Sequence, residues 1–274
     1  QPKSLRVRLL HLPFILRVAA ITLLSLALAR PQLTNRWSSE STEGIDIMMA
    51  LDISGTMLAE DLKPNRLEAA KQVASDFVLA RPNDQIGLVV FAGESFTQCP
   101  LTIDHAVLVN LFQSVEYGMI EDGTAIGLGL ANAVNRMKDS QTKSKVIILL
   151  TDGSNNRGDI DPQTAAEIAK TFGIRVYTVG VGSYGQARVP VQTPIGTQYI
   201  TMDSEFDETT LQRIAQTTGG QYFRATDNSS LKKIYEQIDQ LEKTKLRVRE
   251  YAKHTEDFAP FLYAALLCLL GEIV

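Results

Sequence analysis

Short apolar runs alternate with amphipathic helical repeats through the middle of the chain, and this alternation constrains the fold most. The runs are rich in Ile, Val and Leu, which is typical of strands buried on both faces. The repeats between them carry apolar residues at a period of about 3.6. We therefore predict an α/β fold with an open, mostly parallel sheet and helices on both faces. The predicted strands are 45–54, 86–92, 146–150 and 174–181, with a weaker parallel strand at 221–225 and a short edge strand at 101–103.

Five helices are predicted between and after these strands. They are centred on 67–78, 126–137, 165–172, 211–215 and 231–241. Residues 182–206, which are rich in Gly and Pro, interrupt the pattern. This stretch follows a strand, so we expect it at the carboxyl edge of the sheet, either as a surface hairpin or as a loop beside a binding face.

Apolar segments at the two ends of the chain predict membrane spans. Residues 12–29 contain one charge, Arg17, and approach the ~20 residues that a transmembrane helix needs. Residues 258–274 are also apolar for most of their length and read as the start of a second span. The predicted organisation is an N-terminal basic segment and span (1–30), one domain (40–245), a linker (246–257) and the second span. Since the chain begins with Gln1 and stops inside an apolar segment, we expect it to be part of a longer protein.

Charge around the predicted spans leaves the topology open. Lys3, Arg6 and Arg8 precede the first span and favour a cytoplasmic start, but basic residues also flank both spans on the domain side. The net charge of −4 argues against a generic nucleic-acid-binding protein. The two cysteines exclude a disulfide framework and a four-cysteine zinc site.

Three oxygen-bearing side chains follow the first predicted strand at alternate positions: Asp52, Ser54 and Thr56. In an extended segment they point the same way, and Gly55 allows the backbone to turn so that they converge. Thr124, near a predicted helix start, and Asp152, after the strand at 146–150, are expected at the same edge of the sheet. Carboxylates and hydroxyls are hard ligands that suit Mg²⁺, Ca²⁺ or Mn²⁺. The five residues therefore predict a divalent-cation site.

This arrangement resembles the von Willebrand factor type A (VWA) domain with its metal-ion-dependent adhesion site. The family pattern is Asp-x-Ser-x-Ser, a distant Thr and a later Asp; here Thr56 stands in the place of the second Ser. The phrases DISGTMLAEDLKPNRLEAAK, IGLVVFAGESFTQCPLT and KVIILLTDGSNNRGDIDP resemble the bacterial Bat (Bacteroides aerotolerance) membrane proteins of the BatA type.

The resemblance implies a non-enzymatic protein that recognises other proteins. The implied cation is Mg²⁺, with Ca²⁺ or Mn²⁺ as alternatives. A carboxylate from the partner would fill an open coordination position of this cation. Ser154, Asn155 and the 182–206 loop are weaker predictions for shaping that contact. The resemblance further implies an inner-membrane protein with a periplasmic VWA domain, and an assembly with other Bat proteins and a MoxR-type AAA+ ATPase that serves envelope stress tolerance. An oligomer formed through the spans is compatible with the sequence.

Two alternative functions remain open from the residues. Asp52-x-Ser54-Gly55-Thr56 also resembles the haloacid dehalogenase phosphatase motif, in which Asp52 would be a phosphorylated nucleophile. Ser54 stands where that motif has its second Asp, and this weakens the enzyme interpretation. In the other alternative, the cation stabilises a structural scaffold and takes no part in partner binding.

Overall fold

The computed structural model describes residues 12–29, 44–142, 144–193, 196–203, 207–251 and 259–273. The chain divides into two compact units, one formed by residues 42–244 and the other by residues 1–41 with 245–274. The predicted N-terminal basic segment lies outside the described residues, as does the second half of the predicted linker. Residues 194–195 and 204–206 also lie outside them.

A six-stranded sheet in the order β3-β2-β1-β4-β5-β8 forms the centre of the larger unit. Every neighbouring pair is parallel except β2 and β3, so the predicted mostly parallel α/β sheet is confirmed. The weak run at 221–225 is a parallel strand beside β5, as predicted. The edge strand predicted at 101–103 is the end of a longer antiparallel strand. The strands are β1 (Asp46–Asp52), β2 (Gln85–Phe91), β3 (Ser95–Thr102), β4 (Lys145–Thr151), β5 (Ile174–Val181) and β8 (Tyr222–Ala225).

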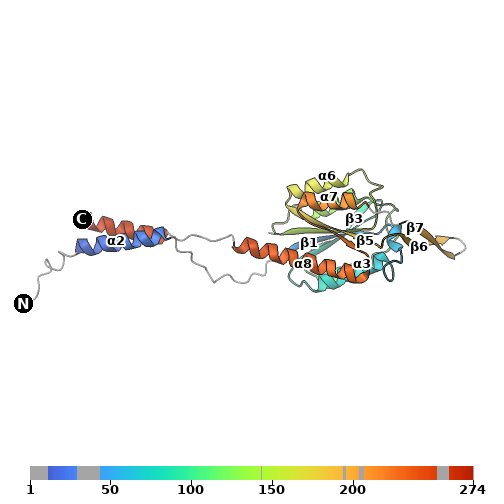
Figure 1. Cartoon of the computed structure of the whole chain (residues 1–274), viewed down its shortest axis with the longest axis horizontal. Coiled ribbons are helices and arrows are strands. Elements are labelled where there is room, and N and C mark those ends of the chain that lie inside the picture. Colours follow the sequence, from blue (N-terminus) through green and yellow to red (C-terminus); the bar gives the residue numbers. More distant parts are fainter. Residues whose placement is uncertain are drawn as a thin grey trace, which may run out of the picture. The chain divides into compact units, whose positions relative to one another are not determined.

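Helices cover both faces of this sheet, with α6 and α7 on one side and α3 and α8 on the other (Figure 1). Because β1 is buried along its whole length, both of its faces contribute to the core. Five helices match the predicted amphipathic repeats, and α4 was not predicted. The helices are α3 (Arg66–Leu79), α4 (His105–Gln113), α5 (Ile126–Met137), α6 (Pro162–Thr171), α7 (Glu208–Thr218) and α8 (Asn228–Tyr251).

The described part of residues 182–206 contains a hairpin, the first of the two predicted forms. Its strands β6 (Gln186–Thr193) and β7 (Gly196–Asp203) pair antiparallel and make a separate two-stranded sheet. Figure 1 shows this hairpin at the same end of the larger unit as the loops that follow β1. The hairpin therefore lies at the carboxyl edge of the main sheet.

The smaller unit contains two apolar helices, α2 (Leu12–Leu28) and α9 (Ala259–Ile273), which pack against each other. At 1.5 Å per residue, their 17 and 15 residues extend about 26 Å and 23 Å, less than the ~30 Å hydrocarbon core of a bilayer. In the part of the chain that the structure describes, no helix combines the length and the apolar character needed to cross a membrane. The spans predicted at 12–29 and 258–274 are not found there as membrane-crossing helices.

Candidate metal centre

The candidate site lies where β1 and β4, neighbours in the parallel sheet, reach their carboxyl ends. Asp52 is the last residue of β1, and Thr151 is the last residue of β4. The register pairs Leu51 with Leu150, so the two strand ends lie side by side. Thr151 Oγ1 donates a 2.5 Å hydrogen bond to Asp52 Oδ2 and fixes that carboxylate at the edge of the sheet.

The loop after β1 turns its hydroxyl groups toward the end of β4. Asp52 Oδ1 accepts a 2.9 Å hydrogen bond from the Ser54 N–H, which closes the turn before the 3₁₀ helix η1 (Gly55–Leu58). Ser54 Oγ lies 3.1 Å from Thr56 Oγ1, and Thr56 Oγ1 donates a 2.7 Å bond to Asp152 Oδ1. Four of the five predicted ligand residues therefore lie in one continuous hydrogen-bonded cluster, although Thr56 and Asp152 are 96 residues apart.

Thr124 approaches the same cluster from the segment that precedes α5. Its backbone is held by the loop after β4: the Thr124 N–H donates to Asn156 Oδ1 at 2.9 Å, and the Asn156 N–H donates to the Thr124 carbonyl at 3.0 Å. A β-carbon at Gly153 would lie 3.3 Å from Thr124 Oγ1, so the glycine allows this hydroxyl to lie directly against the chain beside Asp152. All five predicted residues are thus gathered at one edge of the sheet.

Burial makes the two carboxylates of this cluster electrostatically costly. Asp52 and Asp152 have 0% and 3% of their surface exposed. Burial, together with repulsion from Asp152, raises the pKa of Asp52 from 3.8 to about 7. Burial also raises the pKa of Asp152, against the opposing effect of Arg66. The edge of the sheet therefore holds negative charge that an additional cation would stabilise.

Arg66 and Asp61 belong to this charge cluster and were not predicted. Arg66 Nη1 donates to Asp152 Oδ2 at 2.8 Å, while its Nε donates to Asp61 Oδ1 at 2.7 Å. Burial opposes ionisation of Asp61, but hydrogen bonds from Arg66 and Ser183 lower its pKa overall. One guanidinium is thus shared between two carboxylates. The sequence signal for Arg66 was its position at the start of a helix soon after the motif. Sequence reasoning relates a residue at that position to the end of its own helix, and not to a distant carboxylate.

Asp122 lies at the exposed rim of the site and was also missed. Its Oδ1 accepts hydrogen bonds from the Gly55 N–H and the Gly123 N–H, both at 2.9 Å. The carboxylate therefore ties the loop after β1 to the segment that carries Thr124. In the sequence Asp122 precedes a glycine, and such a pair is typical of a simple turn.

The donor set fits a hard divalent cation. Two carboxylates and three hydroxyls offer oxygen ligands alone, which suits Mg²⁺, Ca²⁺ or Mn²⁺. Among the described residues there is no group of three or more His, Cys, Asp and Glu side chains that could hold a metal ion. A cation at this edge would therefore depend on Ser54, Thr56 and Thr124 as well as on the two aspartates.

Comparison with known proteins identifies the family. The family model of the von Willebrand factor type A domain matches residues 46–237. The chain belongs to the VWA family. The matched range contains the whole six-stranded sheet and all five predicted ligand residues.

Solved structures of Bat-family proteins are similar to this VWA protein. BatB from Bacteroides thetaiotaomicron is 35% identical, with a TM-score of 0.65, and the alignment covers 73% of this chain and 100% of that one. An aerotolerance-related membrane protein from Bacteroides fragilis is 34% identical, with a TM-score of 0.62, and the alignment covers 71% of this chain and 98% of that protein. The predicted resemblance to Bat membrane proteins is confirmed at this level, while the BatA type stays a prediction.

A metal-bound relative comes from a different setting. Proximal thread matrix protein 1 of the mussel byssus, whose structure has a zinc-occupied MIDAS motif, is 25% identical to this chain with a TM-score of 0.57. The alignment covers 73% of this chain and 46% of that protein. The VWA fold is thus one that binds divalent cations and mediates protein contacts, and the identity of the cation in this chain stays a prediction.

The weaker predictions for partner contact have different surroundings. Asn155 Oδ1 accepts from the Gly127 N–H at 3.4 Å, so its amide faces the start of α5. Ser154 is half-buried beside Gly153. The hairpin predicted to shape the contact is joined to the site through Ser183, whose N–H and hydroxyl both donate to Asp61 Oδ2, at 2.7 Å and 3.1 Å.

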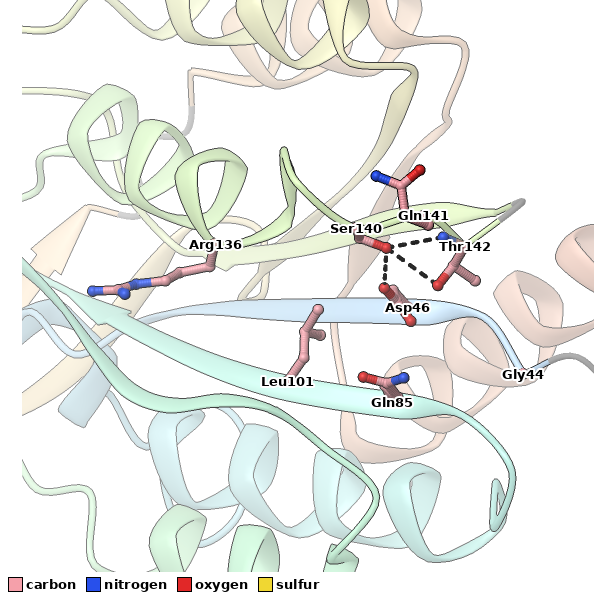
Figure 2. Close-up of a pocket in the computed structure, with 8 residues that line it drawn as sticks. All are labelled: Gly44, Asp46, Gln85, Leu101, Arg136, Ser140, Gln141 and Thr142. Atoms are coloured by element: carbon pink, nitrogen blue, oxygen red, sulfur yellow. Dashed lines mark hydrogen bonds between the residues drawn. The ribbon is translucent and has the colours of Figure 1, made fainter.

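A cavity of the VWA domain lies away from these residues. Figure 2 shows a cavity of about 530 Å³ at the amino ends of β1 and β2, beyond the end of α5. Ser140 Oγ donates to the carboxylate of Asp46 there and lies 3.1 Å from Thr142 Oγ1. None of the five predicted ligands lines this cavity. The candidate metal centre is therefore separate from this cavity.

Proposed function

We propose that this VWA protein binds other proteins through a divalent cation held by Asp52, Ser54, Thr56, Thr124 and Asp152. The observation that carries the proposal is the convergence of these side chains around two buried carboxylates, with Thr56 bonded to Asp152 at 2.7 Å. The cation would offset the charge that burial makes costly, and a carboxylate from the partner would complete its coordination. Mg²⁺ is the proposed ion, because oxygen-only ligands and an open coordination position suit it.

A role in recognition, without catalysis, agrees with the composition of the site. Catalysis of the haloacid dehalogenase type needs a second carboxylate as general acid/base two residues after the nucleophile, and Ser54 occupies that position. Asp52 Oδ2 also accepts a 2.5 Å bond from Thr151, which occupies an oxygen that a nucleophile would use. A scaffold role, in which the ion only stabilises the fold, is the second candidate, and the buried charge at Asp52 favours it as much as it favours adhesion.

We further propose that α2 and α9 attach the domain to the bacterial inner membrane, with the VWA domain in the periplasm. Large apolar side chains of this helix pair face outward: Phe14, Leu28, Tyr263 and Leu267 have 67–82% of their surface exposed. Such an exposed apolar surface needs an apolar environment. The description of the similar Bacteroides fragilis protein as a membrane protein supports the same placement. A reporter that is active only in the cytoplasm, fused after Lys253, would contradict the periplasmic orientation if the fusion were active.

The proposed partners are other Bat proteins and a MoxR-type AAA+ ATPase in an envelope stress-tolerance assembly, with an oligomer as one form of it. The experiment is capture of these purified proteins by the immobilised full chain, in Mg²⁺ and in EDTA. We expect capture in Mg²⁺ that is lost in EDTA and in Asp152→Ala, and retained in Gln141→Ala, an exposed residue beside the cavity of Figure 2. Capture that survives EDTA and Asp152→Ala, with only the melting temperature lowered, would favour the scaffold role.

A further inference from the structure

The β6–β7 hairpin is attached directly to the loop that carries the candidate ligands. Ala59, which follows η1, packs with Ala187 and Val189 of β6 in a small buried apolar cluster. The Glu60 N–H donates to the Arg188 carbonyl at 3.1 Å, so backbone pairing reinforces the apolar contact. The base of the hairpin therefore rests on the segment that follows the metal-binding motif.

A buried chain of charged contacts joins the same hairpin to the other side of the metal centre. Asp61 Oδ2 accepts from the N–H and the hydroxyl of Ser183, the residue that leads from β5 toward β6. Arg66 binds Asp61 through Nε and Nη2, both at 2.7 Å, and binds Asp152 through Nη1 at 2.8 Å. The side chains of Arg66, Asp61 and Asp152 are only 3%, 8% and 0% exposed, so solvent screens these contacts little.

We propose that Asp61 and Arg66 are positioning residues that couple the metal centre to the β6–β7 hairpin. The inference rests on the proposed function for its ion, but its connections exist in the protein alone. Arg66 binds both carboxylates through one rigid guanidinium, so a change at Asp152 changes the hold on Asp61 and hence on Ser183. The state of the metal centre is thereby transmitted to a hairpin at the same edge of the domain.

Coupling of this kind is reciprocal. The negative charge of Asp61 offsets the positive charge of Arg66 beside Asp152. When Asp61 is neutralised, more of the Arg66 charge is left to repel a cation. We therefore expect Asp61→Asn to weaken Mg²⁺ binding about fivefold or more, although Asp61 is not a proposed ligand. Asp139→Asn, the same substitution at an exposed carboxylate after α5, is the matched control and leaves the affinity unchanged.

The test measures amide hydrogen exchange of the full chain without a divalent ion, comparing wild type, Asp152→Ala and Thr124→Ala. Both variants remove a proposed ligand; Asp152 accepts a hydrogen bond from Arg66, whereas the Thr124 N–H donates to Asn156. We expect peptides covering 183–193 to exchange several-fold faster in Asp152→Ala and at the wild-type rate in Thr124→Ala. Ser183→Ala, which removes one of the two bonds to Asp61, gives a milder change in the same peptides and serves if Asp152→Ala does not fold.

The outcomes separate this inference from the proposed function. Equal hairpin exchange in wild type, Asp152→Ala and Ser183→Ala would overturn the coupling, even if Mg²⁺ binds. Absence of Mg²⁺ binding to wild type would overturn the proposed function, while faster exchange confined to Asp152→Ala and Ser183→Ala would still support the coupling.

Discussion

Replacing Asp52 with Asn should stabilise the ion-free domain, although it destroys the proposed metal centre. Asp52 is fully buried, and its pKa in the folded protein is about 7 against an ordinary value of 3.8. Between these two values the unfolded chain is ionised while the folded chain keeps its proton, so stability falls as the pH rises. Above pH 7 the folded protein carries the full cost of the buried charge.

The size of this effect follows from the two pKa values. They differ by about 3, and each factor of ten is worth about 1.4 kcal/mol, so the cost at pH 8 is about 4 kcal/mol. At pH 5 less than half of it, about 1–2 kcal/mol, has developed. For a domain of this size, 4 kcal/mol corresponds to about 10 °C in Tm. Asn keeps the oxygen that accepts from Ser54 and carries no charge, so Asp52→Asn should recover most of this difference.

The assay is thermal unfolding of residues 42–244 in EDTA, followed by circular dichroism at pH 5 and pH 8. We expect Asp52→Asn to melt about 10 °C above wild type at pH 8 and only a few degrees above it at pH 5. Asp139→Asn, an exposed carboxylate after α5, is the control and shows no such pH-dependent gain. Millimolar Mg²⁺ should raise the Tm of wild type alone. An Asp52→Asn variant that melts with or below wild type at pH 8 in EDTA would refute the reasoning.

Three further predictions test the fold and the site. Glu242 is 1% exposed and binds Arg175 and Tyr177, so Glu242→Ala should lower the free energy of unfolding in urea by about 3–5 kcal/mol. The double variant Glu242→Leu with Arg175→Leu should recover most of this loss. A double variant as unstable as Glu242→Ala would contradict the ion-pair account. Gly127→Ala would bring a β-carbon 1.9 Å from the Ile160 carbonyl oxygen, so we expect the free energy of unfolding to fall by about 1–3 kcal/mol. An unchanged midpoint of urea unfolding would refute the close contact. Thr56→Ser keeps the hydroxyl and should keep Mg²⁺ affinity in a titration, whereas Thr56→Val should abolish it; equal affinities of the two variants would exclude Thr56 as a ligand.

Much of the fold could be predicted from periodicity. The strands β1, β4 and β5 are buried on both faces and are continuous apolar runs, so their positions along the chain and their parallel type could be predicted. The helix α4 escaped prediction because only Leu108 and Phe112 of it are buried, too few to make a clear period. The strand β3 was predicted as a fragment, since most of its residues are only half-buried at the edge of the sheet.

The sequence predicted the gathering of the five candidate ligand residues at one edge of the sheet, and it missed the residues around them. Asp52 and Asp152 stand at strand ends, where the parallel topology brings them together without further information. The contact of Arg66 with Asp152 depends on where the start of α3 lies relative to the loop after β4, which no local pattern encodes. The bonds from Ser183 to Asp61 depend on the path of the hairpin in the same way. Sequence spacing therefore locates residues along the sheet edge, while side-chain partners from other elements emerge only in three dimensions.

The most direct test of the central claim is isothermal titration of Mg²⁺, Ca²⁺, Mn²⁺ and Zn²⁺ into residues 42–244. Wild type should bind one ion saturably, with Mg²⁺ affinity lost in Asp52→Ala and retained in the exposed control Gln141→Ala. Binding of the same strength in wild type and Asp52→Ala, or no binding of any of the four ions at millimolar concentration, would contradict a cation site at the ends of β1 and β4.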